Sequence, residues 1–195
     1  MKSSTYNVPM SAAQILVAVA AMTLVVVGSN ILVQYPINNW LTWGAISYPV
    51  AFLVADIINR RFGARSARRV AVAGFVVAVV FSFWAATPRI AMASGTAFLC
   101  SQMLDIYVFD RLRRQSWWRA PFIGGVTGAT LDTALFFSLA FAGTGINWTA
   151  LLMGDLAVKL VVNLALLAPF RALMWNLARP ANMALDTSAV GSANR

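Results

Sequence analysis

Long apolar stretches constrain this chain more than any other feature, because each is long enough to cross a lipid bilayer. A membrane-spanning helix needs about 20 predominantly apolar residues. Six segments meet that length, at 11–33, 40–58, 69–87, 90–109, 120–142 and 148–173. The whole chain is 60% hydrophobic and only 11% charged, unlike the composition of a soluble domain. We therefore predict an all-α, polytopic membrane protein built as a bundle of six transmembrane helices.

The predicted membrane region fills nearly the whole chain, so we expect one transmembrane domain over residues 1–179. The first apolar stretch is too long for the core of a signal peptide, and we interpret it as a retained span. Residues 180–195 are rich in Ala, Ser, Thr and Asn. Because such a composition buries too little apolar surface to fold, we expect a disordered cytoplasmic tail there.

Basic residues indicate how the spans are oriented. The connection after the second segment contains Arg60, Arg61, Arg65, Arg68 and Arg69, and the connection after the fourth contains Arg111, Arg113, Arg114 and Arg119. With six spans, Arg89 is the basic residue left on the opposite side. Because short loops rich in Lys and Arg remain in the cytoplasm, we predict that both termini are cytoplasmic.

The sequence excludes several classes of chemistry. It contains no histidine, so Ser-His-Asp triads and His-ligated zinc sites are ruled out. Its single cysteine, Cys100, allows no intrachain disulfide and suggests no cysteine-based metal site. The net charge of +9 is explained by basic loops between spans rather than by a face that binds nucleic acid. We expect no enzymatic activity, no metal, no cofactor and no nucleic-acid partner.

Acidic residues inside the apolar segments are the most informative polar positions. All six acidic residues are aspartates, and four of them lie in predicted spans: Asp56, Asp105, Asp132 and Asp155. A carboxylate at the centre of a bilayer costs about 2.5–3.5 kcal/mol, which makes such residues candidates for function. Asp56 and Asp105 fall within about one helical turn of a basic loop. They are therefore either functional residues or interfacial partners of the neighbouring Arg60 and Arg111.

Asp132 lies near the middle of its span, and Lys159 reaches a similar depth in the sixth span. An ion pair between the two would let both charges exist in a low-dielectric interior, where either one alone is costly. Asp155 competes for Lys159, because it lies four residues earlier on the same helical face. The pair is either a structural clamp or a functional site. If it is functional, Asp132 is our first candidate for binding substrate or a proton.

Amides, rings and glycines supply further candidate contacts. Asn30 and Gln102 lie within apolar segments, where an amide either joins helices or recognises a polar ligand. Phe136 follows Asp132 by four residues, which places a ring and a carboxylate on one helical face. Three glycines predict close helix packing at the start of the fifth span: Gly124, Gly125 and Gly128.

Several stretches of the chain resemble a known family of transporters. The stretch GAISYPVAFLVADIINRRFG at 44–63 is similar to the signature of the queuosine precursor transporters, also called the vitamin uptake transporter family. Further similarity lies in TPRIAMASGTAFLCSQMLDIYVFDRLRR at 87–114, in LDTALFFSLAF at 131–141 and at Lys159. The chain departs from the family pattern at Arg60, Phe62, Ala120, Gly128 and Ala129.

This resemblance implies a bacterial inner-membrane protein that imports a 7-deazapurine base for tRNA modification. Such bases include 7-cyano-7-deazaguanine, 7-aminomethyl-7-deazaguanine and queuine. A carboxylate can accept the N–H and the exocyclic amine of a guanine-like edge, while an amide or a lysine donates to its carbonyl group. On these grounds we predict that the base contacts Asn30, Phe52, Asp56, Phe98, Gln102, Asp105, Asp132, Phe136 and Lys159.

The sequence leaves three alternatives open. The first is the substrate-binding membrane component of an energy-coupling-factor importer, which would need separate ATPase subunits because this chain has no GxxxxGK[ST] motif. The second is an intramembrane aspartyl enzyme, which needs two aspartates in contact. The third is a structural membrane subunit. Whether the protein forms a homodimer, which deazapurine it carries and what drives transport are equally open at this point.

Overall fold

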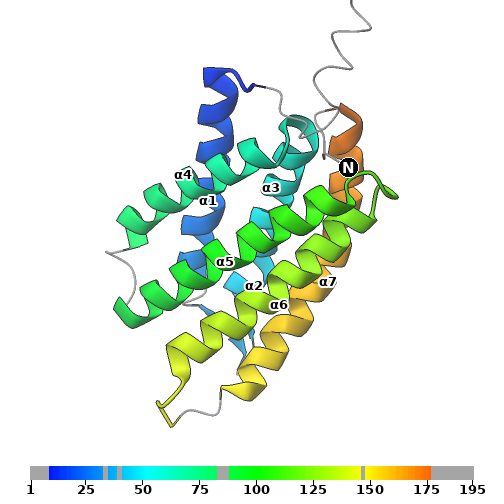
Figure 1. Ribbon diagram of the computed structural model, residues 1–195. Helices are drawn as coiled ribbons and strands as arrows, with labels where there is room; N and C mark the ends of the chain where they lie inside the picture. The colour runs from blue at the N-terminus through cyan, green and yellow to red at the C-terminus, as the bar shows by residue number, and fades with distance from the viewer. Residues whose placement is uncertain (1–8, 33–34, 39–40, 83–87, 146–147, 177–195) are drawn as a thin grey trace, which may run out of the picture.

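The computed structural model describes residues 9–32, 35–38, 41–82, 88–145 and 148–176, and most of that length is helical (Figure 1). The helices are α1 (Ala12–Leu32), α2 (Trp43–Ser47), α3 (Pro49–Phe62), α4 (Ala64–Ser82), α5 (Pro88–Leu112), α6 (Arg119–Phe141) and α7 (Thr149–Asn176). Between α1 and α2, β1 (Pro36–Asn38) pairs antiparallel with β2 (Leu41–Thr42). All six predicted segments contain a helix, so the helical class is confirmed. The predicted tail, 180–195, lies outside the described residues.

Some of these helices look more like membrane spans than others. In the described part of the chain, α1, α6 and residues Thr149–Met174 of α7 are long and apolar enough to cross a membrane. By contrast, α3 has only 14 residues, and α5 carries Gln102 and Asp105 in its second half. The predicted count of six spans therefore stays a prediction, although the structure supplies a helix for each of them.

The arginine-rich connection between the second and third segments is mostly helical, which differs from the predicted loop over 60–69. Arg60 and Arg61 form the last turn of α3, and α4 already begins at Ala64. Arginine favours helices, so the basic residues extend both helices rather than interrupt them. Gly63 alone separates them, with φ of 92°, a conformation that glycine adopts without steric cost.

The second predicted segment is divided rather than continuous. It begins with β2, which pairs with β1 in the preceding connection, and no strand pair was predicted between the first two spans. The helical part is divided at Tyr48, since Pro49 has no N–H to bond to the carbonyl group of Ala45. Tyr48 itself keeps helical angles of −59° and −40°. The side chain of Tyr48 is buried at the junction of α2 and α3.

Contacts between helix ends and the neighbouring loops show that basic residues gather at one end of the bundle. Arg113 Nη2 donates to the carbonyl oxygen atoms of Asn59 at 2.9 Å and Arg60 at 3.0 Å, where α3 ends. Arg60 Nη1 donates to the carbonyl oxygen of Arg113 at 2.8 Å. The guanidinium group of Arg171, late in α7, lies 4.9 Å from the ring centre of Trp117. The ends of α3, α5 and α7 therefore meet.

Arg89 lies at the other end of the bundle. Its Nη2 atom donates to the carbonyl oxygen of Ala142 at 2.6 Å, and its Nε atom donates to that of Leu139 at 3.2 Å. The start of α5 thus meets the end of α6, and helices α3 to α7 alternate in direction between the two ends (Figure 1). This arrangement separates Arg89 from the basic loops, as the sequence predicted.

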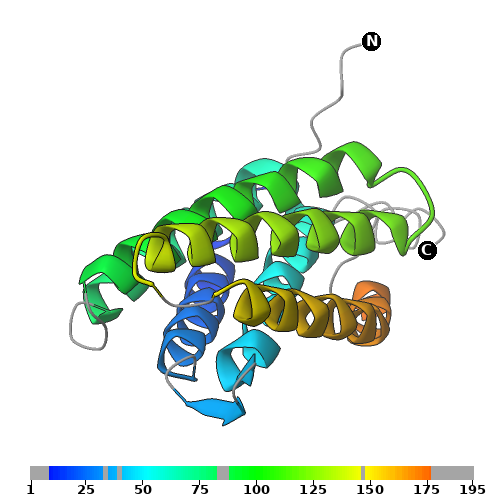
Figure 2. The same ribbon diagram turned by 90° about the horizontal axis from the view of Figure 1, so that it is seen from below.

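The outside of the bundle is apolar, and its largely hydrophobic core also contains buried polar residues. Large apolar side chains are exposed on α1, α5 and α7, among them Leu16 (71%), Leu24 (74%), Met92 (69%) and Val161 (68%). In water such an exterior would be an extensive hydrophobic surface, whereas lipid tails suit it. Inside, α5 packs along α6, and α6 packs against α7 (Figure 2). The fold therefore agrees with a membrane protein.

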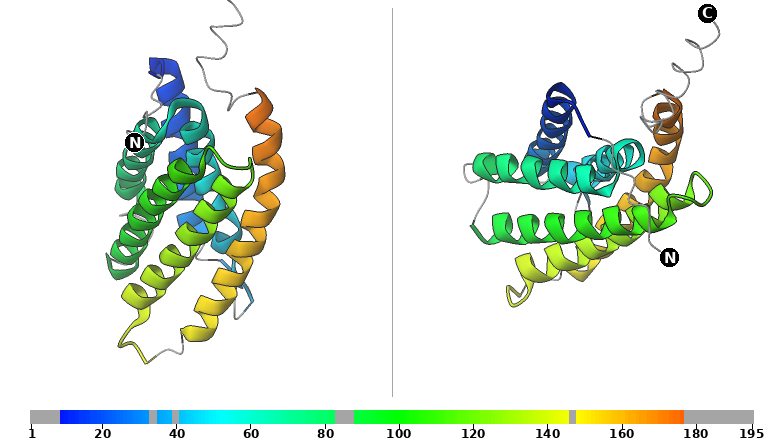
Figure 3. Two further views of the ribbon diagram at one scale, coloured as in Figure 1. Left: turned by 45° about the vertical axis from the view of Figure 1, so that its right-hand side comes forward. Right: turned by 45° about the horizontal axis from the view of Figure 1, so that its top comes forward.

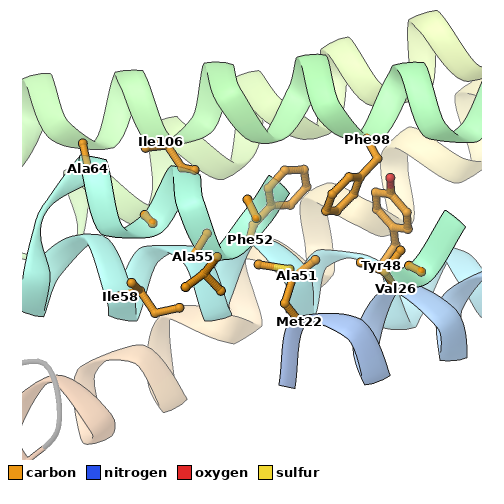
Figure 4. Close-up of a cluster of buried hydrophobic side chains, with 14 of the residues drawn as sticks. Met22, Val26, Tyr48, Ala51, Phe52, Ala55, Ile58, Ala64, Phe98 and Ile106 are labelled. Atoms are coloured by element: carbon orange, nitrogen blue, oxygen red, sulfur yellow. The ribbon is translucent and has the colours of Figure 1, made fainter. Parts of the chain in front are cut away.

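An aromatic cluster fills the space between α3 and α5 (Figure 4). The ring of Tyr48 lies edge-on to those of Phe52 and Phe98, with centroid distances of 6.4 and 6.0 Å. Phe75 of α4 stacks on Phe98 at 5.8 Å. These rings border the buried polar residues described next.

Candidate functional site

Polar side chains are buried along the inner faces of the helices. They are Ser29, Asp56, Asn59, Ser101, Gln102, Asp105, Asp132, Thr133, Lys159 and Asn163. The charged residues among them, together with Asp155 and the polar residues nearby, fall into two groups according to whether their polar atoms have hydrogen-bond partners. The paired set is Asp132, Thr133, Asp155 and Lys159. The unpaired set is Asp56, Asn59, Gln102 and Asp105, each with at least one buried polar atom that lacks a hydrogen-bond partner within the described chain.

The paired set is centred on the ammonium group of Lys159. Lys159 Nζ lies 2.9 Å from Asp132 Oδ2 and 2.6 Å from Asp155 Oδ2, so the predicted ion pair is present and so is its competitor. Lys159 Nζ also donates to Thr133 Oγ1 at 3.2 Å, and Thr133 Oγ1 donates to Asp155 Oδ2 at 2.8 Å. The three N–H groups of the lysine therefore have three acceptors.

Helix geometry explains how these four residues meet. Asp155 and Lys159 are four residues apart on α7 and so face the same direction. Asp132 and Thr133 are consecutive on α6, which runs antiparallel beside α7 (Figure 3). Ser101 of α5 reaches the same place, with Oγ 3.5 Å from Asp132 Oδ1, although its stronger bond goes to the carbonyl oxygen of Phe98 at 3.0 Å.

The unpaired set lies between α3 and α5. Both carboxylate oxygen atoms of Asp105, and both polar atoms of the Gln102 amide, are buried without a hydrogen-bond partner among the described residues. The same is true of Asp56 Oδ1 and Asn59 Oδ1. Asn59 does donate from Nδ2 to the carbonyl oxygen of Ile106 at 3.1 Å, which ties α3 to α5. Such atoms usually find a partner, so each one needs an explanation.

The structure contradicts the interpretation of Asp56 and Asp105 as interfacial partners of arginine. Their exposed fractions are 3% and 0%, and Arg60 bonds to a backbone carbonyl instead. Arg111 turns toward Tyr107, with its guanidinium carbon 5.0 Å from the ring centre. The reason is that α3 and α5 continue about one turn beyond their predicted ends at 58 and 109, which places both carboxylates deeper in the bundle.

The glycines of α6 form the wall against which Asp105 lies. A Cβ atom at Gly124 would be 2.6 Å from Asp105 Oδ1, and one at Gly128 would be 3.1 Å from Asp105 Cβ and 3.0 Å from Phe52 Cε1. At Gly125 a Cβ would collide with the side chain of Asn163. The predicted close packing is confirmed, and it seats Asp105 and the ring of Phe52 side by side.

The aromatic cluster joins the two sets. Lys159 Nζ of the paired set lies 5.2 Å from the ring centre of Tyr48. Tyr48 contacts both Phe52 and Phe98, and Phe52 meets Asp105 across Gly128. Two of the three predicted aromatic contacts therefore border the polar interior.

The remaining predicted contacts lie farther away. Asn30 accepts a hydrogen bond at 3.2 Å from Ser94 Oγ, and Ser94 precedes Ser101 by about 10 Å along α5. Phe136 is half-buried and contacts Phe137 and Phe141, with centroid distances of 5.2 and 6.1 Å. Both residues lie toward the end of the bundle that holds Arg89.

Sequence reasoning missed several members of this interior as site residues. Asp155 was considered only as a competing partner for Lys159, and Asn163 and Tyr48 were not considered. Yet Asp155, Lys159 and Asn163 recur every four residues on one face of an otherwise apolar helix. This four-residue spacing is the sequence signal that could have identified Asn163. In the structure, Asn163 Nδ2 donates to the carbonyl oxygen of Phe122 at 3.2 Å.

A small cavity lies beside the unpaired set. Its volume is about 10 Å³, close to what one water molecule needs, and Asp56 and Asn163 contribute to its lining. No cluster of three or more residues suited to hold a metal ion occurs among the residues that the structure describes. The interior thus combines carboxylates, amides, an ammonium group and rings, which suits a flat polar ligand.

Comparison with known proteins identifies the family. A family model described as "Putative vitamin uptake transporter" matches residues 42–87 and 82–174. The chain is 32% identical to the queuosine precursor transporter of Escherichia coli K12, over 79% of this chain and 83% of that protein. A Haemophilus influenzae protein named "Probable queuosine precursor transporter" is 33% identical over 70% of this chain and 69% of its own length. No solved structure matches the chain.

The matched residues contain both polar sets and the aromatic cluster. The relatives are named as transporters, which supports a transporter role for this protein and is consistent with the absence of enzymatic activity. Nothing in these names supports the energy-coupling-factor alternative. The chain therefore belongs to the vitamin uptake transporter family.

Proposed function

We propose that this protein imports a queuosine precursor, a 7-deazaguanine-type base such as 7-cyano-7-deazaguanine, 7-aminomethyl-7-deazaguanine or queuine. The base binds in the polar interior between α3, α5 and α6. The observation that carries this proposal is the unpaired set, above all Asp105 and Gln102, whose four side-chain polar atoms are buried without partners within the described chain. The relatives' names point to the same class of substrate.

Burial of unpaired polar atoms is costly, which argues that a ligand completes them. Each unsatisfied buried group costs about 1–3 kcal/mol, and more when it is charged. Asp105 and Gln102 are three residues apart and lie on one face of α5. A guanine-like edge offers two adjacent N–H donors to the carboxylate and a carbonyl acceptor to the amide N–H. The pair therefore matches that edge in both hydrogen-bonding directions.

The rings beside this pair complete the site. Phe52 lies against Asp105 across Gly128, and Phe98 lies on the same side of α5 as Gln102. A flat heterocycle can stack on such rings while its edge bonds to the polar atoms. Asp56 belongs to the same unpaired set, and Lys159 is linked to the rings through Tyr48, whose ring centre lies 5.2 Å from Lys159 Nζ. Asn30 and Phe136, which lie toward the Arg89 end, would line the path by which the base approaches.

The same proposal includes an orientation in the bacterial inner membrane. Six spans, with the basic end of the bundle and both termini in the cytoplasm, would place Arg89 outside. Support comes from the clustering of Arg60, Arg113 and Arg171 at one end and from the apolar exterior of the helices. The base would then enter from the Arg89 end and leave near the basic loops.

Uptake of labelled base by cells tests this proposal. A bacterial strain that lacks its own precursor transporter and precursor synthesis should recover uptake when it expresses this protein. Asp105→Asn should abolish that uptake. Asp110→Asn is a matched control, because Asp110 lies in the last turn of α5 and pairs only with Arg113, three residues later at 3.2 Å, among the ion pairs of the described chain. Uptake by Asp105→Asn equal to that of the control would refute the assignment of the unpaired set.

A further inference from the structure

The paired set carries an uneven charge that an uncharged base does not balance. With every group ionised, Asp132 and Asp155 contribute two negative charges and Lys159 one positive charge, all of them buried or nearly so. We propose that the paired set is a proton-binding site, in which Asp132 takes up one proton and thereby couples proton movement to movement of the base. This inference rests on the proposed function only for the identity of the transported base.

The geometry selects Asp132 rather than Asp155 as the group that takes the proton. Asp155 Oδ2 accepts hydrogen bonds from both Lys159, at 2.6 Å, and Thr133, at 2.8 Å, which stabilises its charged form. Asp132 has one short bond, to Lys159 at 2.9 Å, and its other contacts are the long 3.5 Å one between Oδ1 and Ser101 Oγ and an interaction with the hydroxyl group of Tyr48. A proton on Asp132 Oδ1 leaves the pair Asp155 and Lys159 electrically neutral.

The surrounding helices add few groups that could compensate the extra negative charge. Tyr48, from the α2–α3 junction, presents its ring to Lys159 at 5.2 Å. Ser101 from α5 and Thr133 from α6 are uncharged hydroxyl groups. Gly128 lies one turn before Asp132 on α6, and Asp105 of α5 lies beside Gly128. Asp105 is the next charged residue on this side, and it is itself acidic. No cation other than Lys159 contacts these carboxylates in the described chain.

The two bonds of Lys159 respond differently to helix movement. Its bond to Asp155 lies within α7, so it persists when α7 moves relative to α6. Its bond to Asp132 joins α7 to α6 and must break. Protonation of Asp132 replaces this ion pair with a weaker contact, while Lys159 keeps Asp155 as its partner. The proton would therefore loosen one helix contact without leaving a buried lysine unpaired.

Vesicles containing the purified protein separate coupling from base binding. The base is 7-cyano-7-deazaguanine, which carries no charge, and potassium with valinomycin holds the membrane potential at zero. With one proton per base, each unit of pH gradient supports about tenfold accumulation. Asp132→Asn and Asp155→Asn should both lose this accumulation, and Asp155→Asn, which lies outside the predicted base contacts and leaves Asp132 neutralised by Lys159, should retain exchange of labelled for unlabelled base. Wild-type protein that exchanges the base but does not accumulate it under the pH gradient would overturn the coupling and leave the proposed function intact.

A spectroscopic measurement tests the proton site without any base. Infrared difference spectra of the purified protein should show the carbonyl band of a protonated carboxyl group on acidification. Asp132→Asn and Asp155→Asn should both remove this band, because each leaves one carboxylate neutralised by Lys159. Asp105→Asn, the matched control, should retain it. A band that survives both substitutions in the paired set would refute the proposal even if no deazapurine is ever transported.

Discussion

The paired and unpaired sets are both largely buried, but the first has hydrogen-bond partners and the second lacks them. In the paired set, Lys159 holds two carboxylates, and Thr133 bridges it to one of them. In the unpaired set, Asp105 and Gln102 have no such partners in the described chain. The first arrangement can stand alone, whereas the second gains stability from a ligand. Burial of a charge in a membrane protein therefore does not identify a binding site unless its partners are counted too.

Removal of the lysine should give the largest effect, because it converts the paired set into an unpaired one. Lys159→Met leaves Asp132 and Asp155 buried without a cation, which should cost about 3–5 kcal/mol of folding stability. Thermal unfolding in detergent measures this loss. The double variant Lys159→Met with Asp132→Asn should recover part of it, since one carboxylate less is left uncompensated. Equal stability of wild type and Lys159→Met would show that the network does not support the fold.

The same substitution should act differently in the two sets. Asp105→Asn removes a buried carboxylate that lacks a partner, so it should raise the unfolding temperature while weakening base binding by about 1.5–3 kcal/mol. Asp132→Asn should not stabilise, because Asp132 bonds to Lys159 at 2.9 Å. Unfolding and equilibrium binding measured on both variants would test the distinction. A lower unfolding temperature for Asp105→Asn would indicate that the Asp105 carboxylate has hydrogen-bond partners in the protein without base.

Gly124→Ala tests whether the position of Asp105 matters as well as its charge. The new methyl group would lie 2.6 Å from Asp105 Oδ1, so the carboxylate must turn away from α6. We expect a stability cost of about 1–3 kcal/mol from overpacking and a loss of base binding. Gly28→Ala is the control, since no atom lies within 4 Å of a Cβ at that helical position. Normal base binding by Gly124→Ala would mean that the base does not depend on the present position of Asp105.

The aromatic contacts should give the smallest effect and distinguish the site from its approach. Phe52→Leu removes a ring that lies beside Asp105, and we expect base binding to weaken by about 0.5–1.5 kcal/mol. Phe136→Leu should change equilibrium binding less, because Phe136 packs with Phe137 and Phe141 instead. Titration of purified protein with the base compares them. If Phe136→Leu weakens base binding more than Phe52→Leu does, the base binds closer to the Arg89 end of the bundle.

Local sequence patterns were sufficient for much of this architecture. The predicted segments at 11–33 and 120–142 agree with α1 and α6 within a residue at each end, because uninterrupted apolar runs have few ways to fold in lipid. Prediction failed where polar residues sit in a helix, as at 60–69, because arginines were interpreted as a loop although they also favour helices. The depth of Asp56 and Asp105 was misjudged for the same reason.

The sequence by itself determined that this chain is helical and apolar and that four aspartates lie within its apolar segments, since those properties follow from composition and from position along the chain. The contact between Asp155 and Lys159 belongs to this class, because it depends only on the pitch of α7. Which carboxylates have partners was decided by tertiary structure alone. Asp132 meets Lys159, and Asp105 meets the glycines of α6, only through the packing of separate helices.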